Sequence, residues 1–110
     1  MSKVINISVK ELRKKNYNNL LEWLDASKKH IYIGRDMSFY IKGATQSKWH
    51  NPFNVKKYGR EECLKLYEKY LRNNKELMND IKELDGCILG CWCAPLSCHG
   101  DILMKVLNEK

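Results

Sequence analysis

Residues 87–101 read CILGCWCAPLSCHGD and join a short apolar run to four of the five cysteines of the chain. The apolar run Cys87 to Leu89 passes through Gly90 into a Cys-Trp-Cys sequence. A turn is expected at Ala94-Pro95, and an amphipathic segment restarts after Ser97 to His99. This order predicts a strand, a loop and a helix. Ligands of open α/β sheets bind beyond the carboxyl ends of the strands, so we expect the reactive groups of this stretch to lie at a ligand-binding edge.

Two further apolar runs, Val4 to Ile7 and His30 to Ile33, have the length and the composition of strands. Ser8, followed three residues later by Glu11, has the pattern of a capping box at the start of a helix. Apolar residues recur at helical spacing over residues 8–24, 59–71, 75–84 and 101–110. The first of these segments is interrupted near residues 16–19. Long connections that contain helices join parallel strands. The sequence therefore predicts an α/β fold, a small Rossmann-like domain with a mostly parallel sheet of about three strands flanked by helices, and one domain over residues 1–110.

The net charge of +7 is concentrated in the first half of the chain. Residues 1–60 hold 13 Lys and Arg against 4 Asp and Glu, a formal charge of +9, and the remaining residues carry −2. Such an asymmetry favours an anionic partner, either a phosphate-bearing small molecule or nucleic acid. The alternative is a lysine-rich solvated surface without a specific partner.

No stretch of the sequence approaches the ~18 apolar residues of a membrane span, and the first residues lack the apolar core of a signal peptide. We therefore expect a cytoplasmic protein that does not bind membranes. Five cysteines, an odd number, favour free thiols or metal ligands over a disulfide framework in such a compartment.

The second predicted strand ends at Gly34-Arg35. A glycine there lets a ligand approach the backbone closely, and the arginine offers a forked donor that suits phosphate or carboxylate. The alternative is a turn at the end of the strand with a solvated arginine.

Residues 36–58 show no clear period, and loops of this length inside a compact domain are usually functional or mobile. Trp49 and Phe53 are candidates to stack on a base or another ring, Lys48 to contact phosphate, and Asn51 to hydrogen-bond a polar edge of the ligand. The alternative is that the two aromatic residues fill the core beneath a surface loop.

The cysteine-rich stretch allows three interpretations. In the first, Cys91, Cys93, Cys98 and His99 supply the ligand types of a tetrahedral zinc site, although their spacing is irregular. In the second, Cys98 is a nucleophile, because a helix N-terminus and a nearby imidazole lower the pKa of a thiol, and His99 or Asp101 serves as the acid or base.

In the third interpretation, free N–H groups from Ser97 to Gly100 form an anion cradle at the start of the helix. Asp101 then activates water or holds a ribose hydroxyl. Cys93 and Gly100 line the pocket in this arrangement. A structural role for Cys91 and Cys93, as small packed residues at a turn, is the remaining alternative.

Separate motifs of the chain match a known family. They are Tyr32-Ile33-Gly34-Arg35, Ser47-Lys48-Trp49 with Asn51-Pro52-Phe53, Gly59-Arg60, Cys91-Trp92-Cys93-Ala94-Pro95 and Cys98-His99-Gly100-Asp101. With them the chain resembles the family classed as domain of unknown function 4326, small proteins of phages, large DNA viruses and cellular organisms. The resemblance implies that these motifs build one site, and it implies no particular activity.

Two functional hypotheses follow from these observations. In the leading one, the protein binds, and as an enzyme hydrolyses, a nucleotide or nucleoside-like phosphate compound without a cofactor. Gly34, Arg35, Lys48, Trp49, Asn51, Phe53, Cys93 and Gly100 then form the binding site, and Cys98, His99 and Asp101 form the catalytic group. The alternative is a noncatalytic module, either stabilised by zinc and bound to nucleic acid or sequestering a nucleotide.

Overall fold

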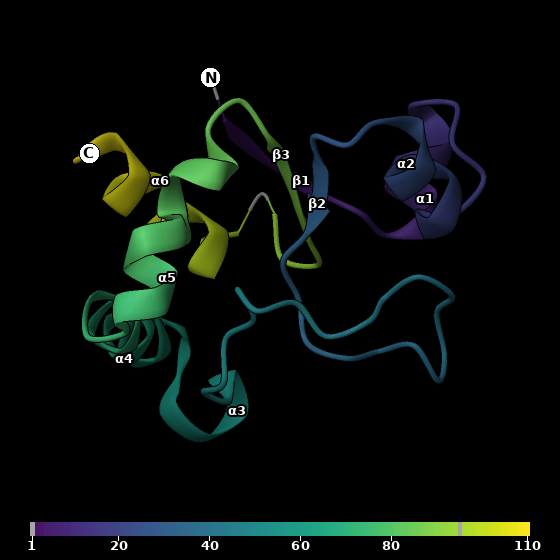
Figure 1. The fold of residues 1–110 in the computed structure, drawn as a ribbon. Helices are drawn as coiled ribbons and strands as arrows, with labels where there is room; N and C mark the ends of the chain where they lie inside the picture. The colour runs from purple at the N-terminus through teal and green to yellow at the C-terminus, as the bar shows by residue number, and fades with distance from the viewer. Residues whose placement is uncertain (1, 95) are drawn as a thin grey trace.

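The computed structural model describes residues 2–94 and 96–110, and in these residues three strands form one parallel sheet (Figure 1). The strands are β1 (Lys3–Asn6), β2 (His30–Tyr32) and β3 (Ile88–Cys91), in the spatial order β1-β3-β2. Leu89 lies at the centre of the sheet, because it is opposite Val4 on one side and Ile31 on the other. The predicted α/β fold with its parallel sheet is confirmed, and the finer label of a Rossmann-like domain stays a prediction.

Helices cover both faces of the sheet. On one side lie α1 (Val9–Lys14) and α2 (Leu20–Ala26), and on the other lie α4 (Arg60–Arg72), α5 (Lys75–Asp80) and α6 (His99–Asn108) (Figure 1). Side chains alternate between the faces, as they do on any strand. Thus Leu89 belongs to the larger core beneath α4 to α6, whereas a side chain at Gly90 would collide with Ile7 and Trp23 of the smaller core beneath α1 and α2.

Two of the differences between the observed and the predicted helices affect the core or the site. The segment predicted as one helix over residues 75–84 is α-helical to Asp80 and continues as a 3-10 helix, η1 (Ile81–Leu84). Residues three apart eclipse one another in a 3-10 helix, which lets Ile81 and Leu84 both enter the core. Helix α6 begins at His99 rather than at Asp101, because Cys98 caps it.

The long segment between β2 and α4 contains one short helix, α3 (Val55–Tyr58), and otherwise has neither helix nor strand. Packing and hydrogen bonds nevertheless anchor it to the protein. Trp49 is 2% exposed within the larger core, and its carbonyl accepts a 2.8 Å hydrogen bond from the buried hydroxyl of Tyr67. Trp49 therefore fills the core, as the alternative prediction stated.

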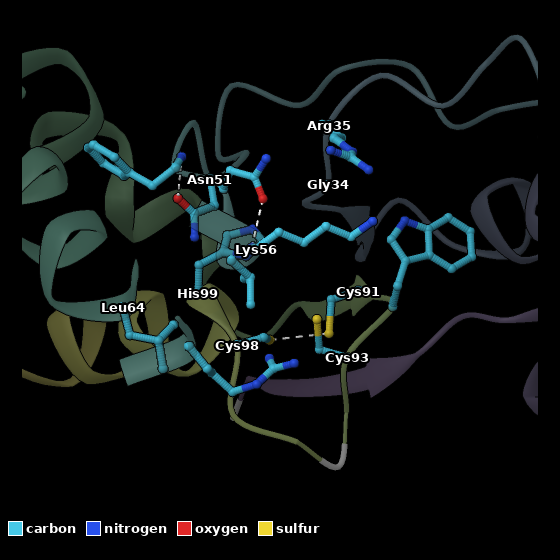
Figure 2. Close-up of a pocket in the computed structure, with 14 residues that line it drawn as sticks. Gly34, Arg35, Asn51, Lys56, Leu64, Cys91, Cys93, Cys98 and His99 are labelled. Atoms are coloured by element: carbon cyan, nitrogen blue, oxygen red, sulfur yellow. Dashed lines mark hydrogen bonds between the residues drawn. The ribbon is translucent and has the colours of Figure 1, made fainter. Parts of the chain in front are cut away.

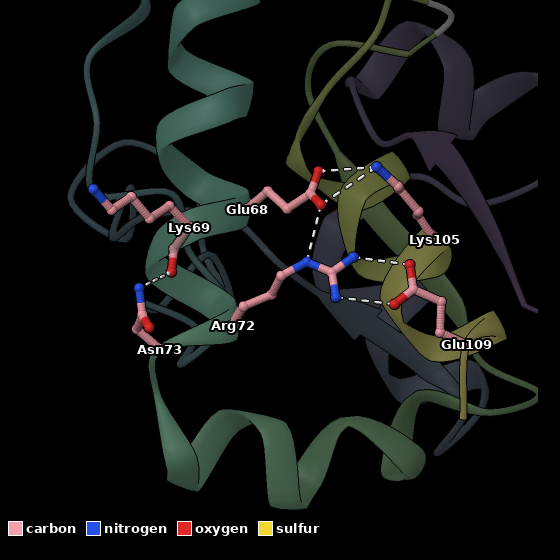
Figure 3. A network of polar contacts seen from close by, with 6 residues as sticks. All are labelled: Glu68, Lys69, Arg72, Asn73, Lys105 and Glu109. Atoms are coloured by element: carbon pink, nitrogen blue, oxygen red, sulfur yellow. Dashed lines mark hydrogen bonds and ion pairs between the residues drawn. The ribbon is translucent and has the colours of Figure 1, made fainter.

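An ion-pair network joins α4 to α6 on the surface (Figure 3). The Arg72 guanidinium contacts both carboxylate oxygens of Glu109, at 2.9 and 2.8 Å, and its Nε contacts Glu68 at 2.9 Å. Lys105 contacts the same Glu68 carboxylate at 3.1 Å. Exposed pairs of this kind contribute little stability singly, but a bidentate network orients the two helices.

Among the described residues, no helix has both the length and the apolar character needed to cross a bilayer. The turn that the sequence predicts at Ala94-Pro95 lies partly outside the described residues, since these exclude residue 95.

Candidate functional site

A cavity of about 420 Å³ lies beyond the carboxyl ends of β2 and β3, where these strands meet α3, α4 and the start of α6 (Figure 2). This is the edge at which ligands of parallel sheets bind. Its described lining residues come from five separate segments. They are Gly34, Arg35, Asn51, Phe53, Asn54, Val55, Lys56, Arg60, Leu64, Cys91, Trp92, Cys93, Cys98 and His99.

Seven residues that the sequence assigned to the site meet around this cavity. They are Gly34, Arg35, Asn51, Phe53, Cys93, Cys98 and His99. The other four, Lys48, Trp49, Gly100 and Asp101, lie outside its described lining. Each of these four has a structural role instead.

Lys48 was expected to hold the ligand's anion, but its Nζ pairs with Glu83 at 2.6 Å and Asp80 at 3.1 Å. The hydrogen bond to Glu83, together with that to Asp80, raises the pKa of the lysine. Asn51 lines the cavity, and its amide donates to the Cys63 sulfur at 3.2 Å and accepts from the Phe53 N–H at 2.9 Å. These bonds hold the loop and use one N–H and one lone pair of the carboxamide. The contact of this amide with a polar ligand edge stays a prediction.

Gly100 is buried, and an added side chain would approach Ile33 Cδ1 to 2.9 Å and Val4 Cγ2 to 3.0 Å. It therefore permits α6 to pack closely on the sheet. The Asp101 carboxylate accepts the backbone N–H of Cys98 at 3.0 Å, while the Cys98 sulfur accepts the N–H of Gly100 at 3.3 Å. These two bonds make a capping box.

Three cations face the cavity, and its described lining holds no carboxylate. Arg35 follows β2, Lys56 lies on α3, and Arg60 opens α4. The Arg60 guanidinium donates to the Ser97 carbonyl at 2.7 Å, which ties α4 to the connection between β3 and α6. Unbalanced positive charge in a concave site raises the local concentration of anions.

Sequence reasoning did not assign Lys56, Arg60 or Leu64 to the site. Arg60 could have been assigned from the sequence, because Gly59-Arg60 is one of the motifs that carry the family resemblance. Lys56 was one of two adjacent lysines, and nothing in their spacing shows which of them faces the cavity.

Two buried thiols form part of the cavity wall. The sulfur atoms of Cys91 and Cys98 are 3.2 Å apart, and these residues are 2% and 3% exposed. The hydrogen bond from Cys98, with backbone N–H groups of Ala94 and Cys93, lowers the pKa of the Cys91 thiol. The same contact and burial raise the pKa of Cys98, although the Gly100 N–H acts in the opposite direction. The sequence predicted a lowered pKa at Cys98, whereas the contact between the two thiols and the nearby N–H groups of Ala94 and Cys93 favour the lower pKa at Cys91.

His99 is held in one tautomer. Its Nε2 lies 2.6 Å from the Ile33 carbonyl, which only accepts hydrogen bonds, so this nitrogen carries a proton. Burial lowers the pKa of the imidazole. The ring is therefore neutral near pH 7, with a lone pair on Nδ1.

The family of the chain follows from comparison with known proteins. The model of the family described as "Domain of unknown function (DUF4326)" matches residues 14–109. The chain belongs to this family. One relative is "Uncharacterized protein R718" of Acanthamoeba polyphaga mimivirus, 34% identical over 102 residues, which are 84% of this chain and 74% of that protein.

Another relative is an "Uncharacterized 12.4 kDa protein in nrdA-td intergenic region" of Enterobacteria phage T4. It is 32% identical over 65 residues, which are 56% of this chain and 60% of that protein. No solved structure matches the chain at a significant level. The family's matched region, residues 14–109, spans every described lining residue of the cavity.

Across residues 2–94 and 96–110, no three His, Cys, Asp or Glu side chains converge to hold a metal ion. In particular, the Nε2 of His99 is directed to the Ile33 carbonyl. The zinc interpretation of Cys91, Cys93, Cys98 and His99 stays a hypothesis.

Proposed function

We propose that the protein binds a nucleotide or nucleoside-like phosphate compound in the cavity beside Cys91 and His99. The observation that carries this proposal is the described lining, which contains Arg35, Lys56 and Arg60 but no carboxylate. Charged donors of this kind suit phosphate oxygens, and arginine binds them in a bidentate geometry.

The size and aromatic content of the cavity support the same ligand class. A volume of about 420 Å³ falls within the ~300–1,000 Å³ of small-molecule sites. Phe53 and Trp92, both partly exposed, line the cavity and offer flat surfaces to a base. We place the protein in a reducing cytoplasmic compartment, a proposal that its five free cysteines support.

Ligand binding is tested by thermal unfolding with nucleoside mono-, di- and triphosphates and with the unphosphorylated nucleosides. A ligand at ~100 times its Kd adds ~2.7 kcal/mol to native stability. We expect the phosphorylated compounds to raise Tm and the nucleosides alone to have little effect. Absence of stabilisation by every phosphorylated compound would contradict the proposal.

Two neighbouring lysines on α3 supply a matched control. Lys56 lines the cavity, whereas Lys57 lies over the Tyr58 ring, 5.2 Å from its centroid, outside the described lining. We expect Lys56→Ala to weaken ligand binding and Lys57→Ala to leave it unchanged. Equal losses in the two variants would indicate nonspecific attraction by the basic surface. A steep dependence on salt would favour a polynucleotide ligand over a mononucleotide.

Hydrolysis of the bound compound is the finer part of the proposal, and the neutral imidazole of His99 supports it. Its Nδ1 accepts a proton from water while the water oxygen attacks the phosphorus of a phosphoester or the anomeric carbon of a glycoside. The leaving group then takes a proton from solvent. Asp101 has no direct part in this step, because its carboxylate caps α6.

The catalytic role of His99 is tested by following product formation with His99→Gln. We expect this variant to bind the ligand and to lose turnover. If the wild-type protein binds the compound and forms no product, the result would indicate a protein that sequesters a nucleotide without hydrolysing it. Full turnover in His99→Gln would exclude the imidazole as the base.

A further inference from the structure

The Cys91 and Cys98 thiols are close enough to be joined by a covalent bond. Their sulfur atoms are 3.2 Å apart, which exceeds a disulfide bond of ~2.05 Å by roughly 1.2 Å. Cys91 ends β3, and Cys98 lies at the N-cap of α6 in an extended conformation. The described part of the connection between them contains no helix or strand, so a small adjustment of loop and side chains brings the sulfurs together.

The other buried cysteines have a different environment. The Cys63 thiol donates to the Phe53 carbonyl at 3.2 Å, and that of Cys87 to the Glu83 carbonyl at 3.4 Å. Neither lines the cavity. These two thiols are held by backbone acceptors, and among the described residues Cys91 and Cys98 alone form a close sulfur pair.

The cavity gives small molecules access to this pair, although both residues are almost fully buried. Cys93 lines the same cavity and is partly exposed. Arg35, Lys56 and Arg60 also line it, and their positive charge raises the concentration of anionic reagents in the cavity.

We propose that Cys91 and Cys98 are a redox-active pair that forms a reversible disulfide by exchange with an anionic low-molecular-weight disulfide. The Cys91 thiolate attacks one sulfur of the reagent; a Cys91–reagent bond forms, the reagent's S–S bond breaks, and one thiolate leaves. Cys98 then loses its proton to solvent and attacks the Cys91 sulfur, which releases the second thiolate. The protein loses two electrons, and the reagent is reduced to two thiols.

This inference goes beyond nucleotide binding and does not depend on it, because it concerns only the thiols and the access that the cavity provides. The experiment treats the fully reduced protein with glutathione disulfide, stops the exchange with acid, alkylates the remaining thiols and maps the peptides without reduction. We expect two of the five cysteines to become protected and one cross-link to join Cys91 to Cys98. Dithiothreitol should restore five alkylated cysteines.

Single variants separate this pair from its neighbours. Cys63→Ser and Cys93→Ser should still form the Cys91–Cys98 disulfide, whereas Cys98→Ser should accumulate a mixed disulfide on Cys91. Circular dichroism shows whether Cys98→Ser is folded. If this variant is unfolded, the peptide map of the wild-type protein alone tests whether Cys91 and Cys98 form the disulfide. A cross-link through Cys93, a mixed disulfide on Cys93 alone, or no protected cysteine would overturn the proposal.

The charge of the reagent tests the role of the cavity. Cystamine is a cationic disulfide, so we expect it to oxidise the pair more slowly than glutathione disulfide at equal concentration. In Lys56→Ala this difference should shrink, and in Lys57→Ala it should persist. Faster oxidation by cystamine would contradict access through the cationic cavity.

Discussion

Of the three strand-to-helix connections at the carboxyl edge of the sheet, those after β1 and β3 differ, because only the connection after β3 borders the cavity. The β1–α1 connection consists of Ile7 and Ser8, whereas the β3–α6 connection covers residues 92–98. The short connection places Ile7, 1% exposed, directly into a core. The long one leaves the sheet and returns, and residues from α3 and α4 face the space so formed. The comparison shows that connection length and the neighbouring elements determine which strand end can hold a ligand.

The two connections touch each other. Asn6, the last residue of β1, donates from its side chain to the Ala94 carbonyl at 2.8 Å and to the Trp92 carbonyl at 3.4 Å. Its carboxamide oxygen accepts the Ser8 N–H at 2.8 Å. One side chain thus bonds to both connections and ties the start of the longer one to the end of β1.

The largest expected effect concerns ligand affinity, and it separates an arginine that lines the cavity from one that follows the short connection. Arg35 lines the cavity, while Arg13 lies in the last turn of α1 after the short connection. A hydrogen bond to a charged group contributes about 1.5–3 kcal/mol, so Arg35→Ala should weaken binding of a stabilising nucleotide by roughly 10–100-fold. Arg13→Ala should leave the Kd unchanged in the same calorimetric titration. Equal affinities of the two variants would show that Arg35 contributes no more to nucleotide binding than Arg13 does.

A smaller difference is expected between the two helix caps. Ser8 makes a 3.4 Å bond to the Glu11 N–H, but the Glu11 side chain does not return the bond, because Asn6 already accepts the Ser8 N–H. The predicted box at Ser8 is therefore half formed. Asp101→Ala should lower the free energy of unfolding by ~1 kcal/mol, and Ser8→Ala by ~0.5 kcal/mol, measured by urea titration. A larger loss in Ser8→Ala would reverse this order.

The smallest expected effect concerns pH and the imidazole at the start of α6. Burial lowers the pKa of His99 in the folded protein, so the unfolded chain binds the proton more readily. This stability is present above the unfolded pKa of ~6.5 and is lost as pH falls through the lower folded value. Between about pH 7 and pH 5, the wild-type protein should lose more stability than His99→Gln.

Subtracting the two pH profiles removes contributions from other groups. Hydrogen bonds also lower the pKa of Glu68 and Glu109, whose losses occur at more acidic pH in both proteins. A difference profile that stays flat through the histidine range would show that His99 does not become harder to protonate on folding.

Much of the cavity was predictable from the sequence because its motifs follow strands. Gly34-Arg35 and Cys93 lie within three residues of the ends of β2 and β3, and parallel strands place their carboxyl ends at one edge. Lys48, predicted to contact the anion, lies outside the described lining and pairs with Glu83, 35 positions away in the chain, a partner that local sequence does not reveal. Lys56 was missed because a short helix of four residues has no period that reveals which side faces inward.

The sequence by itself determined the strands, most of the helices and the basic character of the first half, since local periodicity and composition carry this information. It also placed the cysteine-rich stretch at a strand end. The tertiary structure alone decided which charges remain unneutralised, which thiol has the lowered pKa and which carboxylate caps a helix. Lys48, Cys91 and Asp101 acquire these properties from the atoms around them, and the Cys91 sulfur, the Arg35 guanidinium and the Lys56 ammonium meet at one cavity only after the chain has folded.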